Sequence, residues 1–153
     1  RSGAFTWNGR ANRPGRRVRD GVYAVRFRAP NGAVGHLTLV RRGGRFTGHR
    51  GYRIPAGCAT VHNASLARPA FGGAGRRPLS VWYRLNTASR VTVTIRHAGN
   101  VVRAFRPRDR RDGRTYRLRM PSGGHPRGQY DVTIRAAPAG GAPETIRLAA
   151  TRI

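Results

Sequence analysis

The sequence predicts an all-β chain organised around an antiparallel β-sandwich. Short apolar or alternating runs recur through residues 56–153, and turn residues separate them, a pattern typical of sandwiches. The chain has 153 residues with 21 Gly and 10 Pro, and only 38% are hydrophobic, which favours turn-rich β structure over a helical bundle. The third observation is an internal repeat of about one and a half units.

Residues 56–153 hold about seven predicted strands. Most of these runs alternate between apolar and polar residues, the period of two expected when one face of a sheet meets a core and the other meets water. Turn residues such as Asn86 and Gly99-Asn100 separate them. The predicted strands lie within residues 59–66, 79–85, 90–96, 101–105, 113–120, 126–136 and 144–148.

The repeat is clearest in two hairpins. Residues 19–29 align with residues 126–136, and a turn containing Pro and Gly and a second strand follow each segment. In the first turn, Asn31-Gly32 tolerates the positive φ of a tight turn. One face of each hairpin is therefore predicted to meet a core. The aligned apolar positions are Tyr23 with Tyr130, Val25 with Val132, Phe27 with Ile134, Leu37 with Ile146 and Leu39 with Leu148.

The second copy alone contains the strands that precede the hairpin. We therefore predict that residues 1–46 are the C-terminal half of a first sandwich, residues 47–55 a linker and residues 56–153 a complete sandwich. Half a sandwich leaves strand edges and an apolar face without cover. We expect another protein chain or a preceding segment to complete it; the alternative is that the sequence is a piece of a longer array.

Several motifs together resemble a known domain. Trp7-Asn8-Gly9-Arg10 precedes Asp20-Gly21-Val22-Tyr23-Ala24-Val25, and Tyr83-Arg84-Leu85 is followed by Gly99-Asn100-Val101-Val102-Arg103. These motifs resemble the immunoglobulin-like domain of flagellar hook-capping proteins. The resemblance implies an immunoglobulin-like sandwich of seven strands that serves as a repeated surface or scaffold module, usually without catalysis. In the second copy, Tyr116-Arg117-Leu118-Arg119 takes the place of the first motif.

The charge of the chain is strongly unbalanced. All 31 basic residues are arginines, only five residues are acidic, and the formal net charge is +26. Guanidinium groups bind phosphate, sulfate and carboxylate through paired hydrogen bonds and keep their charge at physiological pH. The densest stretch is therefore our candidate anion-binding site, predicted as a strand end, a long loop and the next strand. Its arginines are Arg103, Arg106, Arg108, Arg110, Arg111, Arg114, Arg117 and Arg119.

The residues that catalysis and metal binding need are scarce. The five carboxylates are predicted in turns, on the polar side of strands or beside arginines, which favours structural roles. Cys58 and His62 are four residues apart, but on a strand that spacing separates them by about 13 Å. We therefore expect a buried or partly buried thiol and no nucleophile. The histidines show no ligand spacing, so we expect no enzyme activity, metal site or cofactor.

The sequence thus predicts a non-catalytic extracellular or cell-surface module, structural or adhesive in role. Its arginine-rich surface is expected to bind an anionic polymer of the cell envelope, or the module assembles with other chains. No apolar run approaches the roughly 18 residues of a membrane span. A basic nucleic-acid-binding protein is the alternative, less favoured because most aromatic residues fall on core positions. A further alternative is an accessory domain of a secreted hydrolase.

Overall fold

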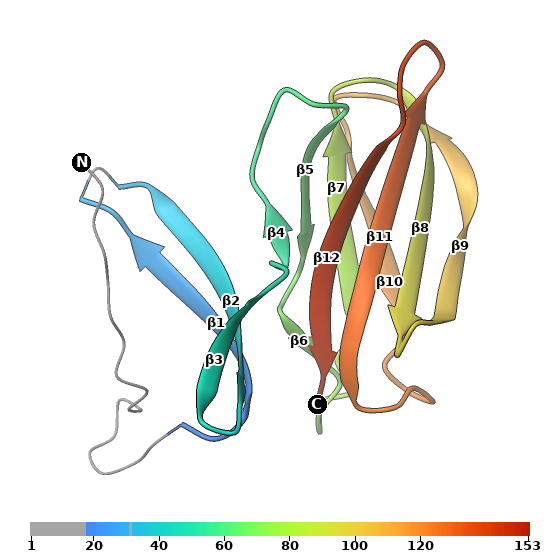
Figure 1. Cartoon of the computed structure of the whole chain (residues 1–153). Coiled ribbons are helices and arrows are strands. Elements are labelled where there is room, and N and C mark those ends of the chain that lie inside the picture. Colours follow the sequence, from blue (N-terminus) through green and yellow to red (C-terminus); the bar gives the residue numbers. More distant parts are fainter. Residues whose placement is uncertain (1–17, 31) are drawn as a thin grey trace.

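The computed structural model describes residues 18–30 and 32–153, and in this part of the chain all regular secondary structure is β (Figure 1). The prediction of an all-β chain is therefore confirmed. The described strands form a three-stranded sheet, a four-stranded sheet and a five-stranded sheet. The motif Trp7-Asn8-Gly9-Arg10 and the turn residue Asn31 lie outside the described residues.

The three-stranded sheet comes first along the chain, and its strands pair in sequence order. The four-stranded sheet has the order β10-β7-β5-β4, and the five-stranded sheet has the order β6-β12-β11-β8-β9. The strand bounds are β1 Gly21–Arg28, β2 Val34–Arg42, β3 Arg45–His49, β4 Arg53–Ile54, β5 Val61–Leu66, β6 Ala70–Phe71, β7 Leu79–Leu85, β8 Ser89–His97, β9 Asn100–Arg110, β10 Thr115–Met120, β11 Gly128–Pro138 and β12 Glu144–Arg152.

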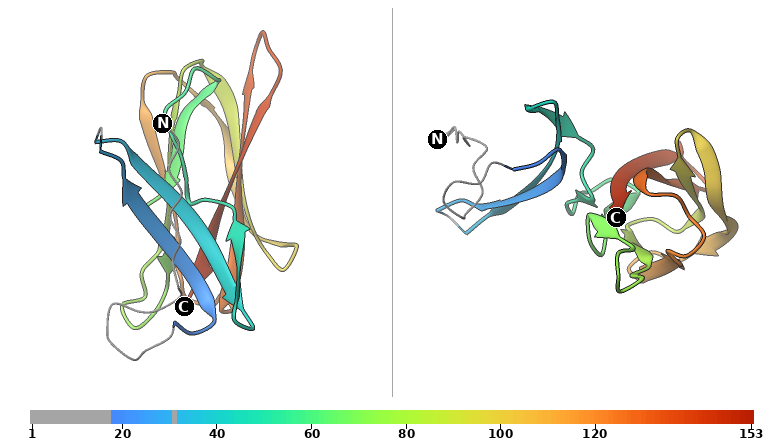
Figure 2. Two further views of the ribbon diagram at one scale, coloured as in Figure 1. Left: turned by 60° about the vertical axis from the view of Figure 1, so that its left-hand side comes forward. Right: turned by 90° about the horizontal axis from the view of Figure 1, so that it is seen from below.

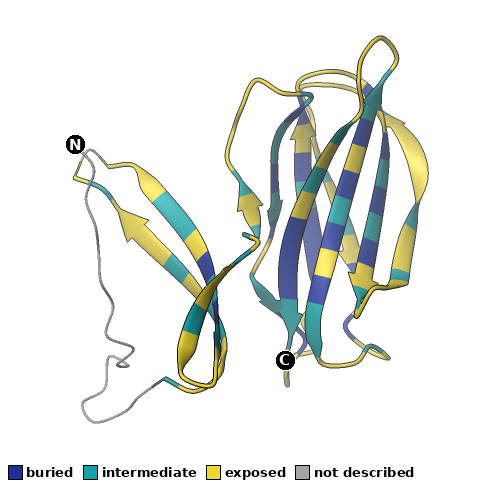
Figure 3. Cartoon of the chain, in the orientation of Figure 1, coloured by how far each residue is buried: buried dark blue, intermediate teal, exposed yellow. Residues whose placement is uncertain are grey.

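The two larger sheets face each other across one hydrophobic core (Figures 2 and 3). The inner faces of β7, β8, β10, β11 and β12 supply most of it, and Val132, Ile134 and Leu148 are completely buried. Alternate residues of these strands point outward, as the period of two predicts. The arrangement is sandwich-like, because the core is shared by the inner faces of two packed sheets.

Every run predicted as a strand in residues 56–153 is a strand, although the bounds differ in places. The predicted count of about seven is not confirmed, because the described structure has eight strands, β5 to β12, in this range. The additional strand is β6, which pairs with β12 through only two residues. A two-residue strand is too short to show alternation in the sequence.

Residues 47–55 include more regular structure than the expected linker. The strand β3 runs to His49, and β4 follows at Arg53–Ile54, where it pairs with β5 as the edge of the four-stranded sheet. The turn before β3 uses Gly43 and Gly44, whose φ values of 53° and 85° suit glycine. The division into two units at residues 46 and 56 stays a prediction.

The two hairpins correspond more closely in structure than in the sequence alignment. The register pairs Val25 with Leu37 in the first hairpin and Val132 with Leu148 in the second. Because Val25 aligns with Val132, Leu37 corresponds to Leu148 and not to Ile146. The predicted alignment of the second strands was wrong by two residues, because the second hairpin is longer. Arg28 pairs with Val34 across residues 29–33, whereas its aligned counterpart Arg135 pairs with Thr145 across residues 136–144.

A tyrosine hydroxyl makes the same bond in each hairpin. The hydroxyl of Tyr130 donates to the carbonyl oxygen of Pro126, four residues upstream, at 2.6 Å. Tyr23, its aligned counterpart, donates to the carbonyl oxygen of Arg19, also four residues upstream. This bond ties the start of a strand to the chain that enters it, as in the tyrosine corner of sandwich domains. The two hairpins thus share this bond at aligned positions.

Substitution of these tyrosines tests the two bonds. Tyr130→Phe keeps the buried ring but removes the hydroxyl, so we expect a loss of about 1 kcal/mol in the free energy of unfolding. Tyr23→Phe removes a bond at an exposed position, so its effect is expected to be smaller. Urea denaturation of both variants measures the difference. Equal losses would contradict the difference in burial.

Candidate anion-binding site

Most of the predicted arginine stretch lies along one side of the sandwich. The strands β9 and β10 are edge strands of the two facing sheets, and a short turn connects them (Figure 2). The predicted long loop was wrong, because β9 continues to Arg110 and β10 begins at Thr115. The two arginine-bearing strands therefore flank the same opening between the sheets.

A cleft of about 270 Å³ lies at this opening. Guanidinium-bearing residues from β9 line it together with an apolar and aromatic floor from β7, β8 and β10. We call the four residues Arg103, Arg106, Arg108 and Arg110 the arginine edge. The other lining residues are Tyr83, Val91, Val93, Ala104, Phe105 and Leu118.

Irregular pairing explains why the arginine edge is so dense. The register between β8 and β9 shifts twice, and at one shift Arg106 and Pro107 lie opposite Thr92 alone. Residues that pair across two strands share a face, so Arg103, opposite Ile95, lies on the inward side of β9. The extra residue of the bulge brings Arg108 opposite Val91, and thus to the same side. Arg106 and Arg108 are both exposed. Pro107 has no N–H group, and charged residues and proline discourage the pairing of an edge strand with another sheet. The guanidinium carbon of Arg103 lies 5.3 Å from the centre of the Phe105 ring. Within the described residues, no carboxylate forms an ion pair with Arg103, Arg106 or Arg108.

Arg110 differs from the other three residues of the arginine edge. Its guanidinium carbon lies 4.5 Å from the centre of the Tyr116 ring, and its Nε is buried without a hydrogen-bond partner. Burial raises the pKa of the Tyr83 hydroxyl, and the nearby positive charge of Arg110 opposes that rise. Arg110 therefore packs against the aromatic floor and positions the end of β9.

The remaining predicted arginines are not in the cleft. Arg111 and Arg114 lie in the exposed turn between β9 and β10. Arg117 and Arg119 lie on the outer face of the four-stranded sheet, where the Arg117 guanidinium carbon is 4.7 Å from the centre of the Trp82 ring. The structure thus divides the eight predicted residues into the arginine edge, the turn and an outer face.

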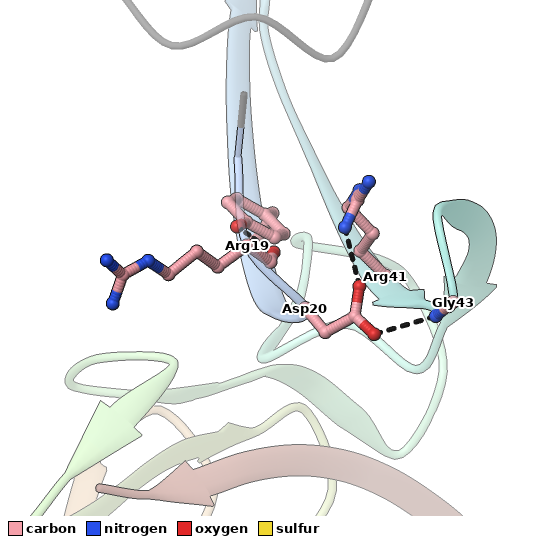
Figure 4. A network of polar contacts seen from close by, with 5 residues as sticks. Arg19, Asp20, Arg41 and Gly43 are labelled. Atoms are coloured by element: carbon pink, nitrogen blue, oxygen red, sulfur yellow. Dashed lines mark hydrogen bonds and ion pairs between the residues drawn. The ribbon is translucent and has the colours of Figure 1, made fainter. Parts of the chain in front are cut away.

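Four of the five acidic residues have structural partners. Asp131 lies 3.2 Å from Arg50, and Asp109 lies 3.5 Å from Arg90. A carboxylate oxygen of Glu144 accepts a hydrogen bond of 2.7 Å from the backbone N–H of Val61. The carboxylate of Asp20 accepts bonds from Arg41 and from the backbone N–H of Gly43 (Figure 4). Structural roles were predicted for these residues, and the contacts agree.

The Asp20 contacts predict a pH dependence. The backbone N–H of Gly43 lowers the pKa of this carboxyl, partial desolvation opposes the shift, and Gly44 and Arg41 lower it further. A depressed pKa in the folded state means that the ionised form contributes stability above the pKa of the unfolded state. That contribution is lost as the pH falls through the folded-state pKa. NMR titration of the Asp20 carboxyl should give a midpoint below that of an unstructured aspartate, and Arg41→Gln should raise it.

A midpoint equal to that of an unstructured aspartate would contradict these contacts. Arg42→Gln serves as the control, because it removes a neighbouring charge while leaving the bonds of Arg41 and Gly43 to Asp20 in place, so the midpoint should be nearly unchanged.

Cys58 was expected to be at least partly buried, but it is exposed, because it lies in the loop before β5. The ring of His62 contacts the carbonyl oxygen of Gly57 at 3.2 Å. Within the described residues, no group of three or more metal-binding side chains gathers. The same part of the chain has no helix able to cross a membrane.

No protein-family model, curated protein or solved structure matches this chain. The resemblance to the hook-capping domain stays a prediction.

Two further surfaces lie outside the cleft, the first predicted from the sequence and the second found only in the structure. The first is the apolar face of the three-stranded sheet, where 56% of Phe27 and 44% of Leu37 is exposed. The second is a set of arginines, including Arg53 and Arg84, on the outer face of the four-stranded sheet. These arginines are scattered along the sequence, so no local motif marks them. The register of paired strands is what brings them to one face.

Proposed function

We propose that this chain is a non-catalytic extracellular or cell-surface module, structural or adhesive in role, which binds an anionic envelope polymer through the arginine edge. The observation that carries the proposal is the gathering of Arg103, Arg106, Arg108 and Arg110 around one cleft. Guanidinium groups held on a strand are already positioned for the acidic groups of a polymer, so less side-chain entropy is lost on binding.

The chemistry of the cleft favours an acidic polymer over a neutral one. Apart from the polar atoms of its backbone, the cleft offers guanidinium groups and the Tyr83 hydroxyl against an apolar floor. Arginine forks pair with carboxylate, sulfate and phosphate alike. A repeating polymer would meet several guanidinium groups at once, and such linked contacts raise the overall affinity.

The fold supports the structural part of the proposal. The shared tyrosine bond and the corresponding registers support a repeat of immunoglobulin-like sandwiches. By this correspondence, the face that carries Phe27 and Leu37 is the inner face of a first sandwich. We propose that a sheet from another chain or from a preceding segment covers it. Size-exclusion chromatography with light scattering tests whether another chain supplies this sheet. If it does, the measured mass should exceed that of one chain.

Column retention tests the anion-binding function. We expect the protein to elute from heparin resin at a higher salt concentration than from a sulfopropyl resin of equal charge density, and not to be retained by neutral dextran. If binding depends on net charge alone, the protein should elute from the heparin and sulfopropyl resins at the same salt concentration. That result would contradict the proposal. Tighter retention on single-stranded DNA than on heparin would favour the alternative, a nucleic-acid-binding protein.

A further inference from the structure

One row of residues crosses the outer face of the four-stranded sheet. In the register, Arg53 of β4 pairs with Ser65 of β5, Ser65 pairs with Trp82 of β7, and Trp82 pairs with Arg117 of β10. Neighbouring strands are about 4.8 Å apart, so the row extends about 14 Å across the sheet. The adjacent positions Ile54, Ala64, Tyr83 and Tyr116 belong to or pack on the core, so the row faces outward.

A groove continues the row beyond its Arg53 end. Its volume is about 690 Å³, and its lining residues come from β1, from β2 and from β4 with the residues on either side of it. Arg26 from β1 and Arg53 from β4 both line it. The hydroxyl of Tyr52, another lining residue, lies 3.0 Å from Nδ1 of His36, so the groove also has a fixed polar wall. Arg53 therefore belongs to both the groove and the row.

We call Arg26, Arg53, Ser65, Trp82 and Arg117 the cationic track. Its charges are not balanced locally, because none of the five carboxylates in the chain lies on this face or lines the groove within the described residues. Asn63 and Thr115 flank the row with small polar side chains. The track thus offers guanidinium groups at intervals and hydrogen-bonding groups between them.

We propose that the cationic track is a second binding site for an acidic polysaccharide, which lies across the strands from the groove to Arg117. This proposal rests on the proposed function, since it assigns the same class of ligand to a further surface. Carboxylate or sulfate groups pair with the guanidinium groups, and sugar hydroxyls bond to the small polar side chains.

The geometry at Trp82 favours a polysaccharide over single-stranded nucleic acid. Proteins that bind single strands stack successive bases on free aromatic rings. On this track, the guanidinium of Arg117 lies over the Trp82 ring, 4.7 Å from its centre. A base that stacks on this face has to displace that guanidinium group. Pairing of an acidic group with Arg117 leaves the contact in place.

Isothermal titration with oligogalacturonate of defined length tests the track. The variant carries Arg26→Gln, Arg53→Gln and Arg117→Gln, all at exposed positions. We expect at least about a tenfold loss of affinity, because three charge-assisted contacts are removed. The control carries Arg96→Gln, Arg135→Gln and Arg147→Gln, which removes equal charge from exposed positions of the other large sheet. This control should lose less than about threefold.

Fluorescence gives a second readout in a Trp7→Phe background, where Trp82 is the remaining tryptophan. Binding should change the Trp82 emission, because the bound ligand covers the indole ring and changes its exposure to water. Equal losses in the track and control variants would overturn the proposal, as would unchanged emission at saturation. Tighter binding of oligodeoxythymidylate, with the same residues required, would replace the polysaccharide by nucleic acid.

The same titration separates this proposal from the proposed function. If only Arg103→Gln, Arg106→Gln and Arg108→Gln together weaken binding, the track is overturned and the arginine edge stands. If oligogalacturonate and heparin oligosaccharides both fail to bind the unchanged protein, both proposals fail.

Discussion

Leu148→Ala is expected to reduce the free energy of unfolding by about 3 kcal/mol. Leu148 is completely buried between the two large sheets and pairs with Val132, which is also completely buried. Truncation removes apolar contacts and leaves a cavity, which the surrounding core residues fill only in part. Urea denaturation followed by circular dichroism measures the loss.

Leu37→Ala provides the matched control, because Leu37 occupies the corresponding register position in the first hairpin. Leu37 is 44% exposed, so its truncation should cost less than about 1 kcal/mol. This small loss is expected for the chain alone; a comparable loss at both positions would show that another sheet covers this face in solution, as proposed above. A loss at Leu148 no larger than about 1 kcal/mol would contradict its complete burial.

The second large effect is expected at the arginine edge. A variant with Arg103→Gln, Arg106→Gln and Arg108→Gln should bind heparin oligosaccharides at least about tenfold more weakly. These three residues line the cleft and are exposed, so their replacement leaves the core intact. Arg110 is kept, because it packs on Tyr116 and its loss would disturb the fold. Isothermal titration at physiological salt measures the dissociation constant.

The matched control for this variant again carries Arg96→Gln, Arg135→Gln and Arg147→Gln. At physiological salt the Debye length is about 8 Å, so distant charges contribute little to a local site. The control should therefore weaken binding by less than about threefold. Equal weakening in both variants would mean that heparin binds to net charge and that the arginine edge is no site.

Local patterns in the sequence were sufficient to predict most strands. The strand β7 has the predicted bounds, because its inner residues Leu79, Val81, Tyr83 and Leu85 alternate with outward ones. The full length of β9 was not predicted, because Pro107 normally ends or interrupts a strand. Proline is tolerated in β9 because β9 is an edge strand, which can lack one backbone N–H bond.

The grouping of arginines was less predictable. Arg103 and Arg110 were predicted to belong to one site, and the cleft unites them. Arg117 was predicted in the same site, but alternation along β10 places it on the outer face beside Trp82. Arg53 was not predicted at all, because its place depends on pairing with Ser65. Register between distant strands depends on the packing of the whole sandwich, which a local pattern does not specify.

The measurement that most directly tests the central claim is an NMR titration of the protein with heparin oligosaccharides. We expect shifts of the backbone amides to concentrate in β9 and β10, with a second group around Arg53 and Trp82. Amides near Arg96, Arg135 and Arg147 should move little. Shifts spread evenly over all exposed arginines, or concentrated on the outer face of the five-stranded sheet, would contradict the account.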